Sequence, residues 1–250
     1  MARRPSDVPR ARLALLEAGA VETRDLAEGL AIDLAALMAA CFPGVDAGPL
    51  QAVADGGIVA RMRAGGASLA AALPDDGLAA LQRHASDTVR GWGAFAVAAR
   101  ARANVAAQVA AIAPFADDAH FAVREWAWLA LRPHVAADPD GAIAALRPWT
   151  RHASDRRRRF ASEATRPRGV WCAHLPSLKA DPSPGLALLE PLRADPSRYV
   201  QDSVGNWLND AAKDNPVWVR AVAATWAEGS ASPATRRILA RGTRSLVQRP

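Results

Sequence analysis

The second half of the chain repeats itself. Residues 115–149 and 192–226 align without a gap at an offset of 77, which pairs Asp118 with Asp195 and Trp149 with Trp226. Residues 155–192 fit a third copy that carries a few extra residues at its centre, around 166–171. Copies of roughly 38 residues are typical of stacked helix pairs of the HEAT type, because a single pair cannot bury its apolar face alone. The repeat predicts three stacked helix pairs over residues 115–226, with one concave face.

Helical periodicity extends over the rest of the chain. Asx-Pro pairs of the kind that start helices support it, and no segment alternates with the period of a strand. Apolar residues at spacings of three and four predict helices over 26–42, 78–99, 121–135, 142–149 and 217–226. Residues 44–49, 56–66 and 165–169 are predicted to be turns or loops. We expect residues 1–250 to form a single all-α HEAT-like domain, a helical repeat solenoid (α-α superhelix), with no recognisable repeat before about residue 100.

Positive charge is concentrated in parts of the chain. The net charge is +6 and the sequence pI is about 10.5. Residues 151–168 hold seven arginines against Asp155 and Glu163, and residues 220–249 hold six against Glu228. A GC-rich genome explains why arginine replaces lysine, but it does not explain the clustering. The clusters indicate an anionic partner.

Several classes of protein are excluded or not expected. No apolar run approaches the 18 residues or so of a membrane span, so no membrane partner is expected. The two cysteines and five histidines are scattered, which predicts no metal site, and we expect no cofactor. The first residues do not have the order of a signal peptide, which favours a reducing bacterial cytoplasm, with the protein associated with the nucleoid.

Two segments carry a resemblance to a known family. Arg158-Arg159-Phe160-Ala161-Ser162-Glu163-Ala164-Thr165-Arg166-Pro167-Arg168 with Trp171, and the stretch from Asn206-Trp207-Leu208-Asn209-Asp210 to Pro216, resemble the HEAT-like DNA alkylation repair glycosylases. The similarity is to the AlkC branch and, more distantly, to AlkD, and it covers about residues 115–226. It implies an all-α superhelix that holds double-stranded DNA on its concave face. It also implies cleavage of the N-glycosidic bond of cationic methylated purines, such as 3-methyladenine and 7-methylguanine.

The resemblance also implies a set of site residues. Alkylation at N3 or N7 makes a purine cationic and a ready leaving group, so the enzyme needs carboxylates that stabilise the sugar cation and aromatic faces for the base. The residues implied for catalysis are Glu125, Glu163 and Asp210. Those implied for contact with the damaged base are Trp126, Trp171 and Asn206. Those expected to bind backbone phosphate are Arg158, Arg159, Arg166, Arg168 and Lys213.

Each acid also has a structural interpretation. Glu125 lies near the start of a helix, where an acid favours the helix dipole. Glu163 could cap its helix or pair with Arg159 or Arg166, and Asp210 could bond Lys213 three residues later. These alternatives remain open at the level of sequence.

The leading interpretation is a monomeric, monofunctional DNA glycosylase that acts in base excision repair on duplex DNA containing alkylated bases. Lys179 and Lys213 are the only lysines, and neither suggests a Schiff-base lyase. The alternative is a non-catalytic HEAT-repeat scaffold that binds nucleic acid or protein, which would not need acids on its concave face. A lyase or chaperone acting on a bound cofactor has no support beyond the architecture.

Overall fold

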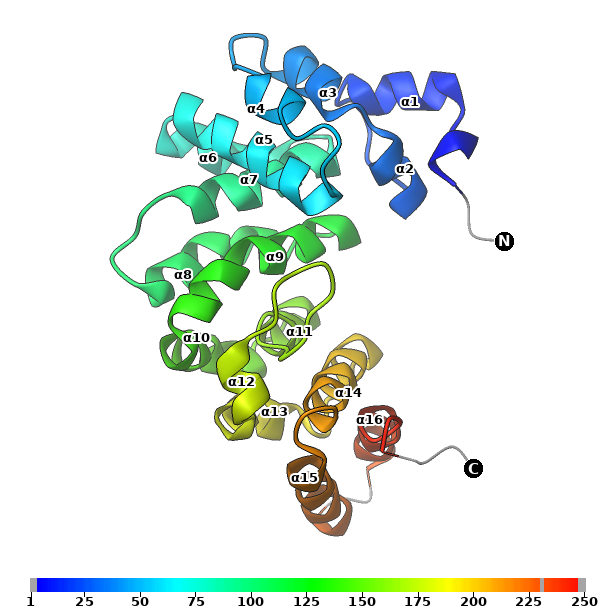
Figure 1. Ribbon diagram of the computed structural model, residues 1–250, viewed down its shortest axis with the longest axis vertical. Coiled ribbons are helices and arrows are strands. Elements are labelled where there is room, and N and C mark those ends of the chain that lie inside the picture. Colours follow the sequence, from blue (N-terminus) through cyan, green and yellow to red (C-terminus); the bar gives the residue numbers. More distant parts are fainter. Residues whose placement is uncertain (1–3, 230–231, 247–250) are drawn as a thin grey trace. The chain divides into compact units, whose positions relative to one another are not determined.

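The chain is helical throughout the part that the structure describes. The computed structural model describes residues 4–229 and 232–246, which form sixteen α-helices joined by turns and short 3₁₀ helices, without a β-strand (Figure 1). The all-α prediction is confirmed. Within these residues, no helix combines the length and the apolar character that crossing a bilayer requires.

The chain divides into two compact units, and the boundaries between them fall just before α8, inside α8 and inside α9. The first unit comprises residues 1–102 and 114–130, and the second comprises 103–113 and 131–250. The helices up to the boundary are α1 (Arg10–Glu17), α2 (Leu26–Ala31), α3 (Leu34–Cys41), α4 (Gly48–Gln51), α5 (Ile58–Ala72), α6 (Asp75–Ala80), α7 (Asp87–Ala99), α8 (Val105–Ala116) and α9 (Phe121–Ala137). Those that follow are α10 (Pro139–Leu146), α11 (Asp155–Glu163), α12 (Pro176–Ala180), α13 (Leu186–Leu189), α14 (Arg198–Ala212), α15 (Pro216–Gly229) and α16 (Pro233–Gly242).

The predicted loop over 56–66 is wrong, because most of it belongs to α5. Its glycines serve close packing against α7 rather than a turn. A Cβ on Gly65 would lie 2.4 Å from Trp92 Nε1, and one on Gly66 would lie 2.3 Å from Phe95 Cβ. Only glycine allows the two helices to approach this closely. The two helices lie side by side in the first unit (Figure 1).

Two segments predicted to be single helices are divided in the structure. Residues 26–42 form α2 and α3, because Asp33 caps the second helix by accepting hydrogen bonds from the backbone N–H groups of Ala35 and Ala36 at 2.9 and 3.1 Å. Residues 78–99 are likewise interrupted before α7, which Ser86 caps through the N–H of Val89. Residues 44–49 are a turn only up to Gly48, where α4 begins, and residues 165–169 lie outside any helix, as predicted.

Helices occupy the positions of the three predicted helix pairs, while the stacking of these pairs stays a prediction. α9 and α14 begin 77 residues apart, and so do α10 and α15, which matches the offset of the repeat. Between them lies the pair formed by α11 with the short helices α12 and α13. The extra residues of this middle copy form the connection from Ala164 to Leu175.

The turn before α7, in the region where the sequence showed no repeat, is held in the same way as the turn before α11. Arg90 donates Nη1 to the carbonyl oxygen of His84 at 2.8 Å, and Nε and Nη2 to the Asp118 carboxylate at 2.9 and 3.3 Å. Arg158 repeats this arrangement with the carbonyl six residues before it (2.9 Å) and with Asp195 (2.7 and 3.1 Å). We call Arg90 and Arg158 the turn arginines, since each fastens the turn before its helix to the start of the next copy. This arrangement is one feature that the region before residue 100 has in common with the later copies.

Candidate active site

Two of the predicted catalytic acids meet around one arginine in the second unit. Glu163 ends α11 and Asp210 lies near the end of α14, and Arg166 lies between them. Arg166 Nη1 donates to Glu163 Oε1 at 2.7 Å, while its Nε and Nη2 both lie 2.9 Å from Asp210 Oδ2. All three side chains are at least nine-tenths buried. We call these three residues the carboxylate centre.

The local sequence explains why Arg166 lies there. α11 ends at Glu163, and Pro167 prevents the helix from continuing. The turn after the helix is held by Trp207, whose Nε1 donates to the carbonyl oxygen of Thr165 at 3.0 Å. Trp207 is fully buried in the core of the second unit. The turn therefore places Arg166 against α14 through a contact between residues 42 positions apart.

Glu163 is held in its ionised form. Burial alone would raise the pKa of this carboxyl, but the charges of Arg159 and Arg166, together with hydrogen bonds, hold the pKa below its usual value. Hydrogen bonds from Arg166 and from the Ser203 hydroxyl act in the same direction, and the latter is 2.6 Å from Glu163 Oε2. Glu163 is thus a negative charge at neutral pH and not a proton donor.

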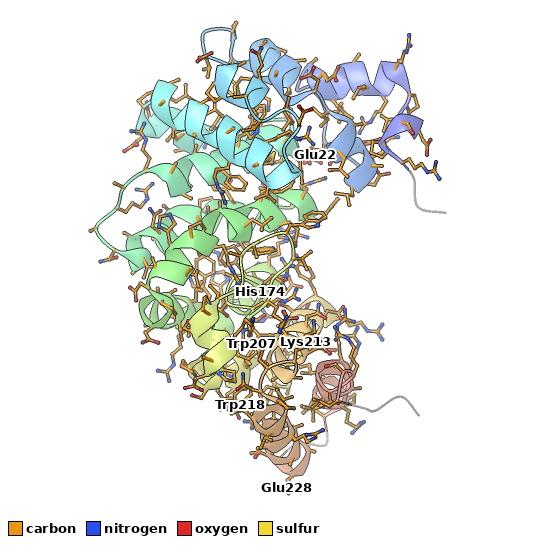
Figure 2. All side chains as sticks on the ribbon, in the orientation of Figure 1. Glu22, His174, Trp207, Lys213, Trp218 and Glu228 are labelled. Carbon is orange, nitrogen blue, oxygen red and sulfur yellow. The ribbon has the colours of Figure 1, made fainter. Side chains whose placement is uncertain are left out.

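Asp210 keeps one oxygen outside this arrangement. Oδ2 takes both contacts from Arg166, while Oδ1 lies 3.7 Å from Nζ of Lys213, the residue that follows α14. Lys213 is about half exposed and is labelled in Figure 2. Oδ1 is therefore the oxygen of the centre with the fewest bonds to protein in the part of the chain that the structure describes.

The polar face of α14 also carries Asn206, which lies three residues after Ser203 and four before Asp210. Its Oδ1 accepts hydrogen bonds from Arg241 Nε at 2.9 Å and Arg244 Nη2 at 3.3 Å. The predicted contact of Asn206 with a base stays a prediction, and the structure places its carbonyl oxygen against α16.

The loop after the carboxylate centre exposes Trp171. Its side chain is half exposed, and its backbone adopts a φ of 60°, in the left-handed region that residues other than glycine rarely occupy. Arg132 anchors the loop by donating to the carbonyl oxygens of Ala164 (3.0 Å) and Ala173 (3.3 Å). A strained backbone, an exposed indole and a loop whose ends are held in place are together typical of a segment that binds a ligand. His174, labelled in Figure 2, follows in the same loop.

The remaining cations predicted to bind phosphate have protein partners. Arg158 is a turn arginine, and Arg159 lies 3.5 Å from Glu163 and stacks over Tyr199, with 4.9 Å between its Cζ and the ring centroid. Arg168 forms a bidentate ion pair with Asp214 at 3.0 and 2.8 Å and is partly exposed. Their binding to phosphate stays a prediction. Arg249, at the end of the C-terminal cluster, lies outside the described residues.

Glu125 and Trp126 belong to the first unit. Glu125 accepts a hydrogen bond from Trp128 Nε1 at 2.8 Å. Trp126 is nine-tenths buried, and it lines a small cavity of about 40 Å³ together with Met62, Asp87 and other residues of that unit. Their membership of one surface with Glu163 and Asp210 stays a prediction.

Sequence reasoning missed the residues that support the centre. Ser203, Arg132 and the pair Arg241 and Arg244 make their contacts across 32 to 41 residues, and no local motif marks such contacts. The one local signal is the spacing of three residues between Glu163 and Arg166 and of four between Arg159 and Glu163, which did suggest pairing. Among the described residues, no group of three or more histidine, cysteine or acidic side chains could hold a metal ion.

Comparison with known proteins supports the fold. No family model matches the chain. A segment of 98 residues is 43% identical to the uncharacterized protein YhaZ of Bacillus subtilis. The matched segment covers 39% of this chain and 27% of that protein. The structure is similar to that of the Pseudomonas fluorescens alkylpurine DNA glycosylase AlkC bound to DNA containing an abasic site analog, with a TM-score of 0.68 and 29% identity. That match covers 86% of this chain and 61% of the other. The chain has an AlkC-like helical fold, as the resemblance predicted.

Proposed function

We propose that this protein is a monofunctional DNA glycosylase that hydrolyses the N-glycosidic bond of cationic alkylated purines in duplex DNA. The observation that carries the proposal is the carboxylate centre, in a fold that matches an alkylpurine DNA glycosylase bound to DNA. The substrates we assign are 3-methyladenine and 7-methylguanine.

The charge state of the centre suits this chemistry. A purine that already carries a positive charge leaves without being protonated, so the reaction does not need a general acid. It needs fixed negative charge beside the sugar, which becomes cationic as the bond breaks. Glu163 is held ionised by its neighbours, which supports a role as an electrostatic stabiliser. A glycosylase that protonates its leaving group would instead favour a carboxyl with a raised pKa.

We assign the contact with the sugar cation to Asp210 Oδ1. Arg166 occupies Oδ2 and fixes the carboxylate, while Oδ1 has only Lys213 nearby among the described residues. Glu163 contributes its negative charge on the opposite side of Arg166 from Asp210, and Arg166 positions both acids through its hydrogen bonds. Arg166 is therefore a positioning residue in this proposal rather than a phosphate contact, because its guanidinium is already bonded to both carboxylates.

Trp171 supplies the aromatic face in this proposal. An exposed indole can stack on a base, and it attracts a cationic base more strongly than a neutral one. The exposed fraction of Trp171 and the anchoring of its loop by Arg132 support this assignment. Lys213 and Arg168, which are the more exposed of the predicted cations, are the phosphate contacts that we retain.

The test is to incubate the protein with duplex DNA treated with a methylating agent and to identify the bases released. We expect 3-methyladenine and 7-methylguanine in solution, intact strands that carry abasic sites, and loss of release in a variant with both Glu163→Gln and Asp210→Asn. Strand cleavage at the abasic sites would contradict the monofunctional assignment. Binding to DNA without release of any base would favour the non-catalytic scaffold.

A further inference from the structure

The polar face of α14 extends beyond the carboxylate centre to the last helix. Asn206 Oδ1 receives hydrogen bonds from Arg241 on α16 and from Arg244 just after it. α14 and α16 pack side by side in the second unit (Figure 1). One amide oxygen therefore brings two guanidinium groups together next to the centre.

The two arginines differ in their partners. Arg241 Nη1 lies 3.3 Å from Asp202, which Arg237 also contacts at 2.8 Å. Arg244 has no acidic side chain within ion-pair distance among residues 4–229 and 232–246. Its Nη1 donates instead to the carbonyl oxygen of Arg241 at 2.6 Å, at the end of α16. The Arg244 charge is therefore not balanced by a direct partner within the described chain.

The positive charge of Arg244 lies in surroundings that disfavour it, so a bound anion would stabilise it. Partial burial lowers the pKa of this guanidinium, the charges of Arg241 and Arg166 lower it further, and Asp210 acts in the opposite direction. Capping the carbonyl end of a helix explains one N–H of Arg244. This capping does not explain why Asn206, a residue type that is unfavourable inside a helix, also accepts a hydrogen bond from Arg241.

We propose that Arg241, Arg244 and Asn206 form a binding site for one backbone phosphate of the DNA strand that carries the damaged base. The inference rests on the proposed function, because it places the phosphate beside the carboxylate centre. The two non-bridging oxygens of a phosphodiester suit two adjacent guanidinium groups. Such a contact carries no sequence information, as suits an enzyme that must act at any sequence. Asn206 is then a positioning residue for the arginines.

The experiment measures duplex binding as a function of salt for Arg244→Gln and for the double variant Arg241→Gln with Arg244→Gln. The probes are a duplex with an abasic-site analogue and the same duplex undamaged. We expect the Kd to rise on the order of tenfold for the single variant, and the slope of log K against log salt to become shallower by about one for each phosphate that is no longer bound. The matched control is Arg220→Gln on α15, which removes the same charge from an exposed position.

The outcomes separate this inference from the proposed function. A lower slope in Arg244→Gln, with no change in Arg220→Gln, supports the phosphate site even if the wild type releases no base. An unchanged salt slope in both Arg244→Gln and the double variant overturns the phosphate site, even if the wild type is an active glycosylase. An equal decrease of the slope in the control Arg220→Gln also overturns it. Arg244→Lys keeps the charge without the planar group and should retain the slope while binding more weakly. Equal melting temperatures for the single variants and the wild type show that binding is compared between folded proteins.

Discussion

Two arginines of the second unit, Arg158 and Arg166, form ion pairs of different kinds. Arg158 binds one carboxylate and two backbone carbonyls of the turn before its helix. Arg166 binds two carboxylates and no backbone group among the described residues. The bonds to an acid and to the carbonyls of the preceding turn recur at Arg90, which also pairs with Glu22. An ion pair that recurs from copy to copy is expected to serve the fold, whereas the Arg166 pairs, which bridge two acids of α11 and α14, support the proposed function.

The aligned copies sharpen this contrast. Counting back in steps of 34 residues, the spacing between Arg90, Arg124 and Arg158, places Leu129 and Phe95 at the position of Glu163. Both are buried apolar residues. The fold therefore accepts a hydrophobic side chain where Glu163 lies, and replacing it by a charge costs stability unless the charge is fully paired. Arg159, Arg166 and Ser203 provide that pairing, which supports the functional role that we propose for the acid.

The largest expected effect on stability comes from Arg166→Met. Removing this arginine leaves two buried carboxylates without their main partner, and it should lower the free energy of unfolding by about 3–5 kcal/mol. Chemical denaturation measures the change. Adding Glu163→Gln and Asp210→Asn to this variant should restore most of the loss, because uncharged amides cost far less to bury. A variant that stays as stable as the wild type would mean that the centre is not ionised.

Asp195→Asn should have a smaller effect, of about 1.5–3 kcal/mol, since it removes the charge that pairs with the turn arginine Arg158 but keeps a hydrogen-bond acceptor. Thermal unfolding monitored by circular dichroism measures it. The rate of base release per folded molecule should be unchanged. A rate that falls in parallel with that of Asp210→Asn would erase the distinction between the two arginine sites.

Trp171→Gly separates strain from function. Glycine accepts the backbone φ of 60°, so the variant should gain about 1 kcal/mol in unfolding free energy. Loss of the aromatic face should slow base release about tenfold. Trp207→Phe is the opposite case, because this buried indole holds the turn before Arg166 and its loss should lower stability. Faster release by Trp171→Gly would exclude a contact with the base.

The smallest effect should appear in the dependence on pH. Because the pKa of Glu163 is lowered in the folded state, its contribution to stability is fully present above the unfolded-state value of about 4.3. That contribution disappears as the pH falls through the lower folded-state value. From pH 5 to 8 neither stability nor base release should change through Glu163. The rate of base release is measured against pH for the wild type and for Glu163→Gln. A change in rate between pH 5 and 7 that the wild type shows and the variant lacks would contradict the ionised state of Glu163.

Sequence patterns predicted the helices and the repeat, because periodic apolar residues and Asx-Pro starts are local signals. They failed where packing overrides local preference, as at Gly65 and Gly66, which lie inside a helix against α7. The spacing of Glu163 and Arg166 suggested a pair, but their joint contact with Asp210, 44 residues from Arg166, depends on tertiary structure. The same holds for Arg244, which reaches Asn206 across 38 residues.

The most direct test compares single-turnover release of 3-methyladenine by Asp210→Asn and Asp195→Asn on the same methylated duplex. Both variants neutralise a buried aspartate paired with an arginine in the second unit. We expect Asp210→Asn to slow release on the order of 100-fold or more, the scale of losing a preorganised electrostatic group. Asp195→Asn should release the base at the wild-type rate per folded molecule despite its lower melting temperature. Wild-type release by Asp210→Asn would contradict the account.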